Sequence, residues 1–387
     1  MFKFDPYSPE MDADPFPYYK TLRDEHPCFW SDEAKMWVLS RHEDISGALQ
    51  NWQTYSSAQG NLMDELPNRA GATLGTTDPP RHDRLRALIQ KAVSKRALDH
   101  IIKPTLASAN KQLDSLQGEE SFDFVADFSS KVTVDLLFYL FNMPTENQGV
   151  VRDNAVLMVQ SDPVTRQKGP QHVAAFNWMT DYASDLVAAR KRNPGEDLLS
   201  QFIVAEIDGE RLLDRELQMT VTTLIMAGIE SLSGFMTMFA TNLAAHPEAR
   251  QAIVANPTLL PDAMEESLRF NTSAQRFRRC LQQDTALHGK TMRKGDFVCL
   301  AYGSGNRDER RFPDADSYDI YRKPRGHLGF GGGVHICFGT AIARLAVNIA
   351  FGEFLQRIPD FTITDERLPW MPSTTFRSPL RLNLRVN

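Results

Sequence analysis

The feature that most constrains the fold is an apolar helical stretch from about Asp214 to Ala245, which ends before His246-Pro247. At about 1.5 Å per residue a helix of this length spans ~48 Å, whereas the average helix has only ~11–12 residues. Few charges interrupt the stretch, so other parts of the chain must cover it on all sides. The sequence therefore predicts a helix that crosses the centre of a large, mostly helical protein.

The rest of the chain divides into a helical and a strand-like portion. Amphipathic helical patterns occupy the chain from about residue 81 to 204 and from about 339 to 358. After residue 279 short strand-like runs, at 287–291 and 296–300, lie among Gly, Asn, Asp and Pro. A length of 387 residues suits two or three domains or one large fold. The predicted architecture is mainly α with a small β-rich part.

Composition excludes several classes of protein. With 42% hydrophobic and 24% charged residues the chain is ordinary globular material, and a net charge of −6 disfavours a general nucleic-acid binder. The 23 phenylalanines indicate a large apolar interior or cavity. The first residues do not resemble a signal peptide, and no run of ~18 uncharged apolar residues occurs. We expect a cytoplasmic protein with no membrane or nucleic-acid partner.

The strongest local signal is the segment 330–339, Phe-Gly-Gly-Gly-Val-His-Ile-Cys-Phe-Gly, which leads into a predicted helix. The other cysteines form no C-x-x-C pair with Cys337 or with each other. The loop lacks the Lys-Ser/Thr of a phosphate loop, and His335 is badly placed as the base for a cysteine nucleophile. A single thiolate bound to haem iron needs only one Cys on a loop that approaches a flat ligand closely. These residues alone leave a haem ligand and an ordinary turn open.

The segment Phe-Gly-x-Gly-x-His-x-Cys-x-Gly resembles the haem-binding signature of the cytochrome P450 superfamily, and Arg344 matches the Ala-Arg of the helix that follows. Glu266-x-x-Arg269 resembles a second family motif, and Arg322 lies in the segment whose arginine joins that pair. The resemblance runs from about Asp14 to the C-terminus and looks like the soluble bacterial type. It implies the cytochrome P450 fold as one domain over residues 1–387, with haem between an α-rich and a β-rich lobe.

The resemblance also implies the cofactor and its ligands. The cofactor is haem b (iron protoporphyrin IX), with Cys337 as the iron ligand. His82 and Arg86 are four positions apart and so share a helix face. They match positions that hold a haem propionate in the family, as do Arg279 and His335. The alternative for each is a solvated or internally satisfied side chain.

The long helix contains Ala-Gly-Ile-Glu-Ser at 227–231, which resembles the family's Ala/Gly-Gly-x-Asp/Glu-Thr. In the family the glycine opens a groove for dioxygen, and the acid and hydroxyl deliver protons, so Glu230 and Ser231 are the catalytic candidates. Ser231 departs from the usual threonine and lacks the methyl group that restricts the rotamer. A helix kink with a polar packing pair is the other interpretation.

The activity implied is that of a haem-thiolate monooxygenase that hydroxylates or O-dealkylates a small, mostly apolar, aromatic or terpenoid-like substrate. Electrons are expected from a ferredoxin and an NAD(P)H-dependent ferredoxin reductase, and the protein is expected to be a monomer. A peroxide-driven haem-thiolate peroxygenase and a non-catalytic haem carrier or sensor are the alternatives. An acidic ferredoxin would meet a cluster of basic residues, unless these form an ordinary solvated face: Arg81, Arg84, Lys91, Lys95, Arg96 and Arg325.

Overall fold

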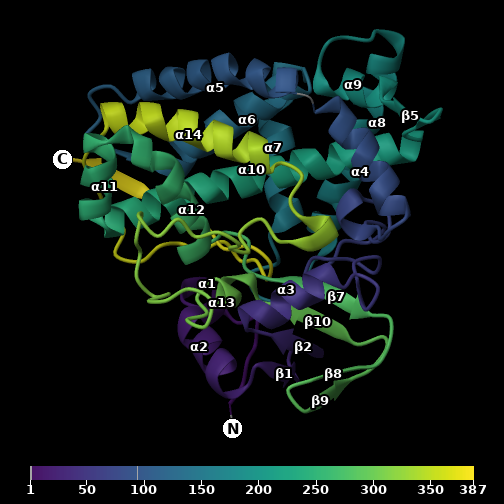
Figure 1. Ribbon diagram of the computed structural model, residues 1–387. Helices are drawn as coiled ribbons and strands as arrows, with labels where there is room; N and C mark the ends of the chain where they lie inside the picture. The colour runs from purple at the N-terminus through teal and green to yellow at the C-terminus, as the bar shows by residue number, and fades with distance from the viewer. Residues whose placement is uncertain (1, 94) are drawn as a thin grey trace.

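The computed structural model describes residues 2–93 and 95–387, without the side chains of residues 95–97. Figure 1 shows a large helical part above a smaller part that contains most of the strands and the N-terminus. The helical part contains α4 (Arg81–Ala92), α5 (Lys95–Ser115), α6 (Ser130–Leu140), α7 (Gln148–Val159), α8 (Pro170–Arg192), α9 (Leu198–Val204), α10 (Asp214–Ala245), α11 (Pro247–Ala255), α12 (Leu260–Phe270) and α14 (Thr340–Arg357). The smaller part contains α1 (Pro9–Ala13), α2 (Phe16–Glu25), α3 (His42–Gln50) and α13 (Tyr302–Gly305).

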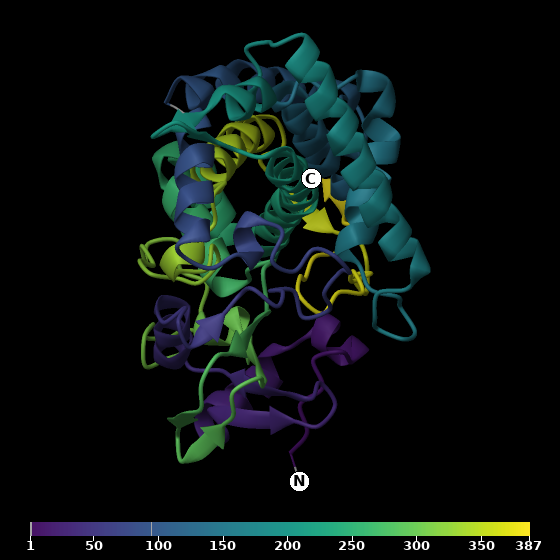
Figure 2. The same cartoon turned by 90° about the vertical axis from the view of Figure 1, so that its right-hand side faces the viewer.

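The α10 helix confirms the predicted central helix. Its first turn is capped by Glu216, whose carboxylate accepts a hydrogen bond from the Leu213 backbone N–H at 3.0 Å, and it ends at His246, before Pro247. Figure 2 views it nearly end-on, with the other helices around it. In the part of the chain that the structure describes, it is the one helix long and apolar enough to cross a bilayer. Neighbouring helices bury most of that apolar stretch instead.

The glycine at position 228 has a packing role that sequence reasoning did not anticipate. α10 runs unbroken through residues 227–231. A Cβ at Gly228 would lie 2.8 Å from Cδ1 of Leu137 on α6. Gly228 therefore also lies where α10 and α6 approach each other closely.

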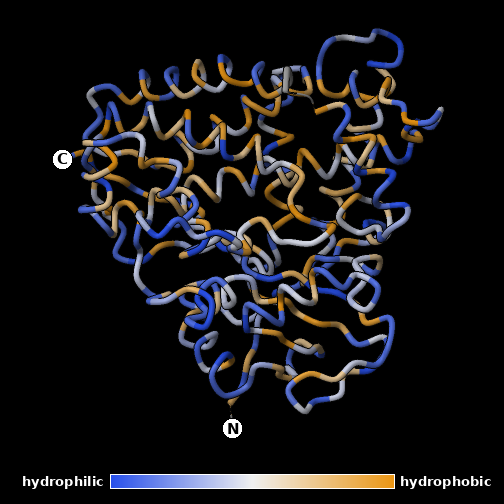
Figure 3. Tube along the Cα trace, in the orientation of Figure 1, coloured by the Kyte–Doolittle hydropathy of each residue, from blue (hydrophilic) through white to orange (hydrophobic). Residues whose placement is uncertain are grey.

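The phenylalanines account for much of the helical core. Phe239 of α10 packs against Phe351 of α14 in a tilted arrangement with ring centroids 4.5 Å apart, and Phe124 meets Phe354 edge to face at 5.2 Å. Such pairs add about 0.5–1.5 kcal/mol beyond their buried area. Figure 3 shows apolar residues along α10 and α14 in the interior and hydrophilic residues at the periphery.

Four small sheets complete the fold. The largest has the order β1 (Cys28–Ser31), β2 (Met36–Leu39), β10 (Phe297–Leu300), β7 (Phe277–Leu281) and β3 (Tyr55–Ser56). A second has the order β11 (Phe361–Ile363), β12 (Asn383–Val386) and β4 (Ser121–Asp123). The hairpins are β5 (Glu206–Ile207) with β6 (Glu210–Arg211) and β8 (Thr285–Leu287) with β9 (Lys290–Met292). The parallel pairing of β10 with β2 connects the N-terminal region to the segment before the cysteine loop.

The predicted strand at 287–291 is wrong, because this segment is a hairpin turn. His288 and Gly289 adopt positive φ angles of 49° and 71° and separate β8 from β9. Two successive residues with positive φ match the twist of a tight hairpin. Leu287 and Lys290–Thr291 do lie in strands, but in two different ones joined by this turn.

The Glu266–Arg269 pair forms, with Arg322, the buried ion cluster that the sequence suggested. The Glu266 carboxylate accepts bonds from Arg269 Nε at 2.8 Å and Nη2 at 2.7 Å, and from Arg322 Nε at 3.2 Å. Glu266 and Arg269 are both fully buried. The cluster holds α12 to the segment before the cysteine loop, since Arg269 also donates to the carbonyl oxygens of Asn306, Ala315 and Ser317.

Candidate active site

The cysteine loop is folded tightly against α3 just before α14. Gly331 and Gly333 have positive φ angles of 69° and 62°. A Cβ at Gly333 would lie 1.9 Å from the carbonyl oxygen of Leu49, so only glycine fits there. The Cys337 N–H donates to the Phe330 carbonyl at 2.9 Å and closes the loop. This geometry presents the Cys337 side chain three residues ahead of the α14 N-terminus.

The Cys337 side chain is exposed at the end of the cysteine loop. Desolvation by the surrounding protein nevertheless raises the pKa of its thiol, against the opposing effects of the Gly339 N–H, the Thr340 hydroxyl and the Arg86 and Arg344 charges. The donors around the sulfur favour a thiolate.

Two histidines with unpartnered nitrogens lie beside this loop. The rings of His82, on α4, and His335 are 4.6 Å apart at their centroids. Nε2 of His82 and both ring nitrogens of His335 are buried without a hydrogen-bond partner among the described residues. Burial lowers the pKa of His335, and the Arg279 and His82 charges add to the effect, against the Asp78 carboxylate, whose Oδ1 lies 3.6 Å from Nε2 of His335. Unpartnered buried donors are costly, so these rings fit a ligand that accepts hydrogen bonds.

Two arginines near the same loop have no acidic partner among the described residues. Arg86 donates to the Ile336 carbonyl at 3.0 Å, and burial lowers its pKa while the Cys337 charge opposes that change. Arg279, on β7, is 3% exposed and donates to the Arg278 carbonyl at 2.8 Å. Buried charge requires compensation. The predicted residues His82, Arg86, Arg279 and His335 therefore surround a position suited to carboxylates.

The middle of α10 contributes a partly open face. Thr223, Ala227, Glu230 and Ser231 keep partial exposure, whereas most of the residues between them are buried. Their spacing of three and four residues places them on one side of the helix. Burial raises the pKa of Glu230 to about 7. The Ser231 hydroxyl forms no hydrogen bond with any described residue. An acid and a hydroxyl thus lie together on the more accessible side of α10.

Two of the basic residues expected to attract an acidic partner, Arg81 and Arg84, face carboxylates instead. Arg84 pairs with Glu210 and, at 3.0 Å, with Glu216, and Lys91 donates to the Glu206 carbonyl. Arg81 lies 3.7 Å from Glu216 and donates to the Gly71 carbonyl. The side chains of Lys95 and Arg96 lie outside the described residues. Folding brings the acidic β5–β6 hairpin to α4, which no local sequence pattern indicates.

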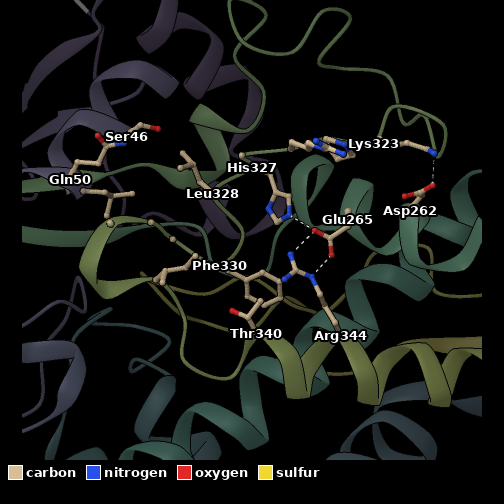
Figure 4. Close-up of a pocket in the computed structure, with 18 residues that line it drawn as sticks. Ser46, Gln50, Asp262, Glu265, Lys323, His327, Leu328, Phe330, Thr340 and Arg344 are labelled. Carbon is tan, nitrogen blue, oxygen red and sulfur yellow. Dashed lines mark hydrogen bonds and ion pairs between the residues drawn. The ribbon is translucent and has the colours of Figure 1, made fainter. Parts of the chain in front are cut away.

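Sequence reasoning missed a surface hollow of about 700 Å³ on the outer side of the cysteine loop. Figure 4 shows Arg344, on α14, in a two-bond pair with Glu265 at 2.6 and 2.7 Å, and His327 on the same carboxylate at 2.9 Å. Lys323 and Asp262 are 3.5 Å apart at its rim. The sequence contained one indication of this hollow, Arg344, which matched a family position. No partner for its side chain could be predicted from the sequence.

The site defines a class of protein. A cysteine presented just before the N-terminus of a helix, with basic side chains near its loop, fits a flat cofactor that binds iron through sulfur and carries carboxylates. This is the site of a haem-thiolate protein.

Comparison with known proteins identifies the family. The cytochrome P450 family model matches residues 13–376. The chain is 32% identical to cytochrome P450 123 of Mycobacterium tuberculosis, over 99% of this chain and 96% of the relative. It is 33% identical to nocardicin C N-oxygenase of Nocardia uniformis subsp. tsuyamanensis, over 97% of each chain. The solved structure of cytochrome P450 CYP109Q5 from Chondromyces apiculatus superposes with a TM-score of 0.90 at 27% identity, over 100% of this chain and 98% of that one.

The chain belongs to the cytochrome P450 family, and it has the cytochrome P450 fold of its structural neighbours. It is a haem-thiolate monooxygenase. Proteins of this family bind haem (iron protoporphyrin IX), and bacterial members typically use redox partners and bind apolar substrates.

Proposed function

We propose that this enzyme hydroxylates or O-dealkylates a small, mostly apolar substrate of aromatic or terpenoid-like type, using O2 and electrons from a ferredoxin. The observation that carries the proposal is the partly open face of α10, on which Glu230 and Ser231 lie with Thr223 and Ala227. Leu74, Leu224 and Phe376 also pack on the core and remain partly exposed. A compact apolar molecule matches such a surface.

The proposed cofactor ligands follow from the unpartnered groups. Cys337 would bind the iron, and His82, Arg86, Arg279 and His335 would bind the propionates, where their free donors and uncompensated charges converge. Haem bound through a thiolate supplies the activation of dioxygen. The protein contributes charge compensation at the carboxylates and an apolar space from which water is excluded.

Glu230 and Ser231 are proposed to handle protons. With its pKa at about 7, owing to burial, the Glu230 carboxyl exchanges protons readily near neutral pH. The Ser231 hydroxyl is adjacent in sequence, and no described residue occupies its hydrogen-bonding capacity. The hydroxyl is therefore available to receive a proton from Glu230 on the same side of α10 and to pass it to a molecule bound beside the helix.

The hollow of Figure 4 is the proposed ferredoxin site. Phe330, Gly331 and Ile336 of the cysteine loop form part of its floor, so a partner seated there lies close to Cys337. Arg325 in its lining is exposed and forms no ion pair with a described residue. An acidic partner would find a free cation at this position.

We also propose one cytoplasmic, monomeric domain over residues 1–387. The pairing of β2 with β10 and of β4 with β12 interleaves distant parts of the chain, which supports one folding unit. Light scattering of the purified protein tests the monomer, and limited proteolysis tests the single domain.

The deciding experiment combines a spectrum with turnover. The reduced protein with carbon monoxide is expected to show the red-shifted Soret band of thiolate ligation, and Cys337→Ser is expected to lose it. Titration with small aromatics, terpenoids and fatty acids is expected to give a type-I shift with the first two groups. Those ligands should then yield oxidised product with NAD(P)H, a ferredoxin and its reductase. A histidine-type spectrum in the wild type would refute the assignment of Cys337.

Two outcomes would favour other functions. Product formation with hydrogen peroxide alone, unchanged in Ser231→Ala, would indicate a peroxygenase. The absence of any spectral shift, together with no partner-dependent NAD(P)H use, would indicate a haem carrier or sensor.

A further inference from the structure

Glu230 lies one helical turn before Gly234, at the place where α10 meets the C-terminal loop. A Cβ placed at Gly234 would lie 3.4 Å from Cβ and 3.5 Å from Oγ of Ser378, and 3.5 Å from Cβ of Ser273. Residues four apart share a helix face. Two serines therefore pack against the face of α10 that carries Glu230, and the nearby Ser378 hydroxyl lowers the pKa of the Glu230 carboxyl, against the effect of burial.

The loop that carries Ser378 is held firmly. The Ser378 carbonyl accepts a bond from the Met371 N–H at 2.9 Å. The neighbouring Arg377 donates to the carbonyls of Asp12 at 2.7 Å and Ala13 at 2.6 Å, and to the Asn271 side chain at 2.8 Å. Ser378 itself is 4% exposed. Its hydroxyl thus reaches α10 from a backbone that has little freedom to move.

Charged groups on the surrounding segments do not act on Glu230. The guanidinium of Arg377 is directed to the backbone of α1, and that of Arg276 donates to the Thr374 carbonyl at 2.9 Å. Burial raises the pKa of Glu230, and among the described residues the Ser378 hydroxyl opposes that change.

We infer that Ser378 is the positioning residue of Glu230: its hydroxyl donates to the carboxylate, fixes the carboxyl group on the open face of α10, and keeps both protonation states accessible. A hydrogen bond to the ionised form stabilises that form relative to the protonated one. Without the bond, burial alone would favour the protonated acid, which would release its proton less readily. The inference rests on the proton-handling role proposed for Glu230 and adds a residue from a segment nearly 150 positions away.

The test measures the ionisation of Glu230 directly in the haem-loaded protein. The infrared C=O band of the protonated carboxyl is assigned as the band that Glu230→Gln removes, and its intensity is followed against pH. Ser378→Ala is expected to move the midpoint upward by about one pH unit, a tenfold change in the dissociation constant. Ser378→Thr keeps the hydroxyl and should restore the wild-type midpoint. Ser273→Ala removes the other serine beside Gly234 and should leave the midpoint unchanged.

An unchanged midpoint in Ser378→Ala would overturn the inference, as would an equal shift in Ser273→Ala, since the effect would then come from packing. Retention of the thiolate Soret band shows that each variant binds haem. The pH profile of product formed per NAD(P)H should move upward with the infrared midpoint in Ser378→Ala. Product formation that is unaffected by Glu230→Gln would instead refute the proposed role of Glu230, and the titration result would still decide the role of Ser378.

Discussion

Replacement of Glu266 by glutamine is expected to destabilise the protein strongly. Glu266 is fully buried and accepts bonds from Arg269, from Arg322 and, at 3.0 Å, from the Asp319 N–H. Glutamine has nearly the same shape as glutamate but carries no charge. Its amide NH2 group is itself a donor, and it would face the N–H donors that now bind the carboxylate. Glu266→Gln therefore leaves the buried Arg269 guanidinium without its counter-charge.

The magnitude follows from the burial of both partners. Removing one member of a buried ion pair costs about 3–5 kcal/mol, a large part of a typical stability of ~5–15 kcal/mol. The carbonyls of Asn306, Ala315 and Ser317, which Arg269 also binds, cannot supply the lost negative charge. We therefore expect Glu266→Gln to lower the free energy of unfolding by the full amount for a buried pair, about 3–5 kcal/mol.

The adjacent Glu265 offers a matched control. Its side chain is 25% exposed and its partner Arg344 is 42% exposed. Water can solvate Arg344 after Glu265→Gln, so we expect a smaller loss than for Glu266→Gln. The two substitutions are chemically identical and one position apart, and they differ chiefly in burial.

Urea unfolding of both haem-loaded variants, followed by far-ultraviolet circular dichroism, measures the difference. We expect the midpoint of Glu266→Gln to fall well below that of Glu265→Gln at similar slopes. Equal losses in the two variants would refute the reasoning, because burial of the charge would then not set the cost.

Three further outcomes are expected. Arg86→Ala and Arg279→Ala should each release haem to apomyoglobin about 30-fold faster, because truncating one partner of a buried charge pair costs ~2 kcal/mol or more; wild-type rates in both would contradict their role. Ser231→Ala should lower product per NAD(P)H, and Ser231→Thr should keep it, because the methyl restricts the rotamer; equal yields in all three proteins would exclude this hydroxyl. Although burial alone raises it, bonds from Arg344 and His327 lower the pKa of Glu265 from 4.5 to about 2. The ionised Glu265 therefore stabilises the folded protein above pH 4.5, and this stabilisation is lost as the pH falls to about 2. Over that range the wild type should lose more unfolding free energy than Glu265→Gln. Equal losses in the two proteins would refute the lowered pKa of Glu265.

Local patterns in the sequence determined the features that depend on neighbouring residues. The apolar run of α10, the spacing of Glu266 and Arg269 on α12, and the glycines around Cys337 each indicate their structure within a few positions. Helix periodicity and loop conformation depend on short-range sterics and hydrogen bonds, which a single stretch of chain contains.

Only the tertiary structure decided which distant groups meet. It places Leu137 against Gly228, the acidic β5–β6 hairpin beside α4, and Ser378 against the turn of α10 that carries Glu230. These partners are separated by roughly 90 to 150 positions, and chain topology, rather than any local propensity, brings them together. The residues that surround the cysteine loop could be named from the sequence, but the groups that set the ionisation of Glu230 could not.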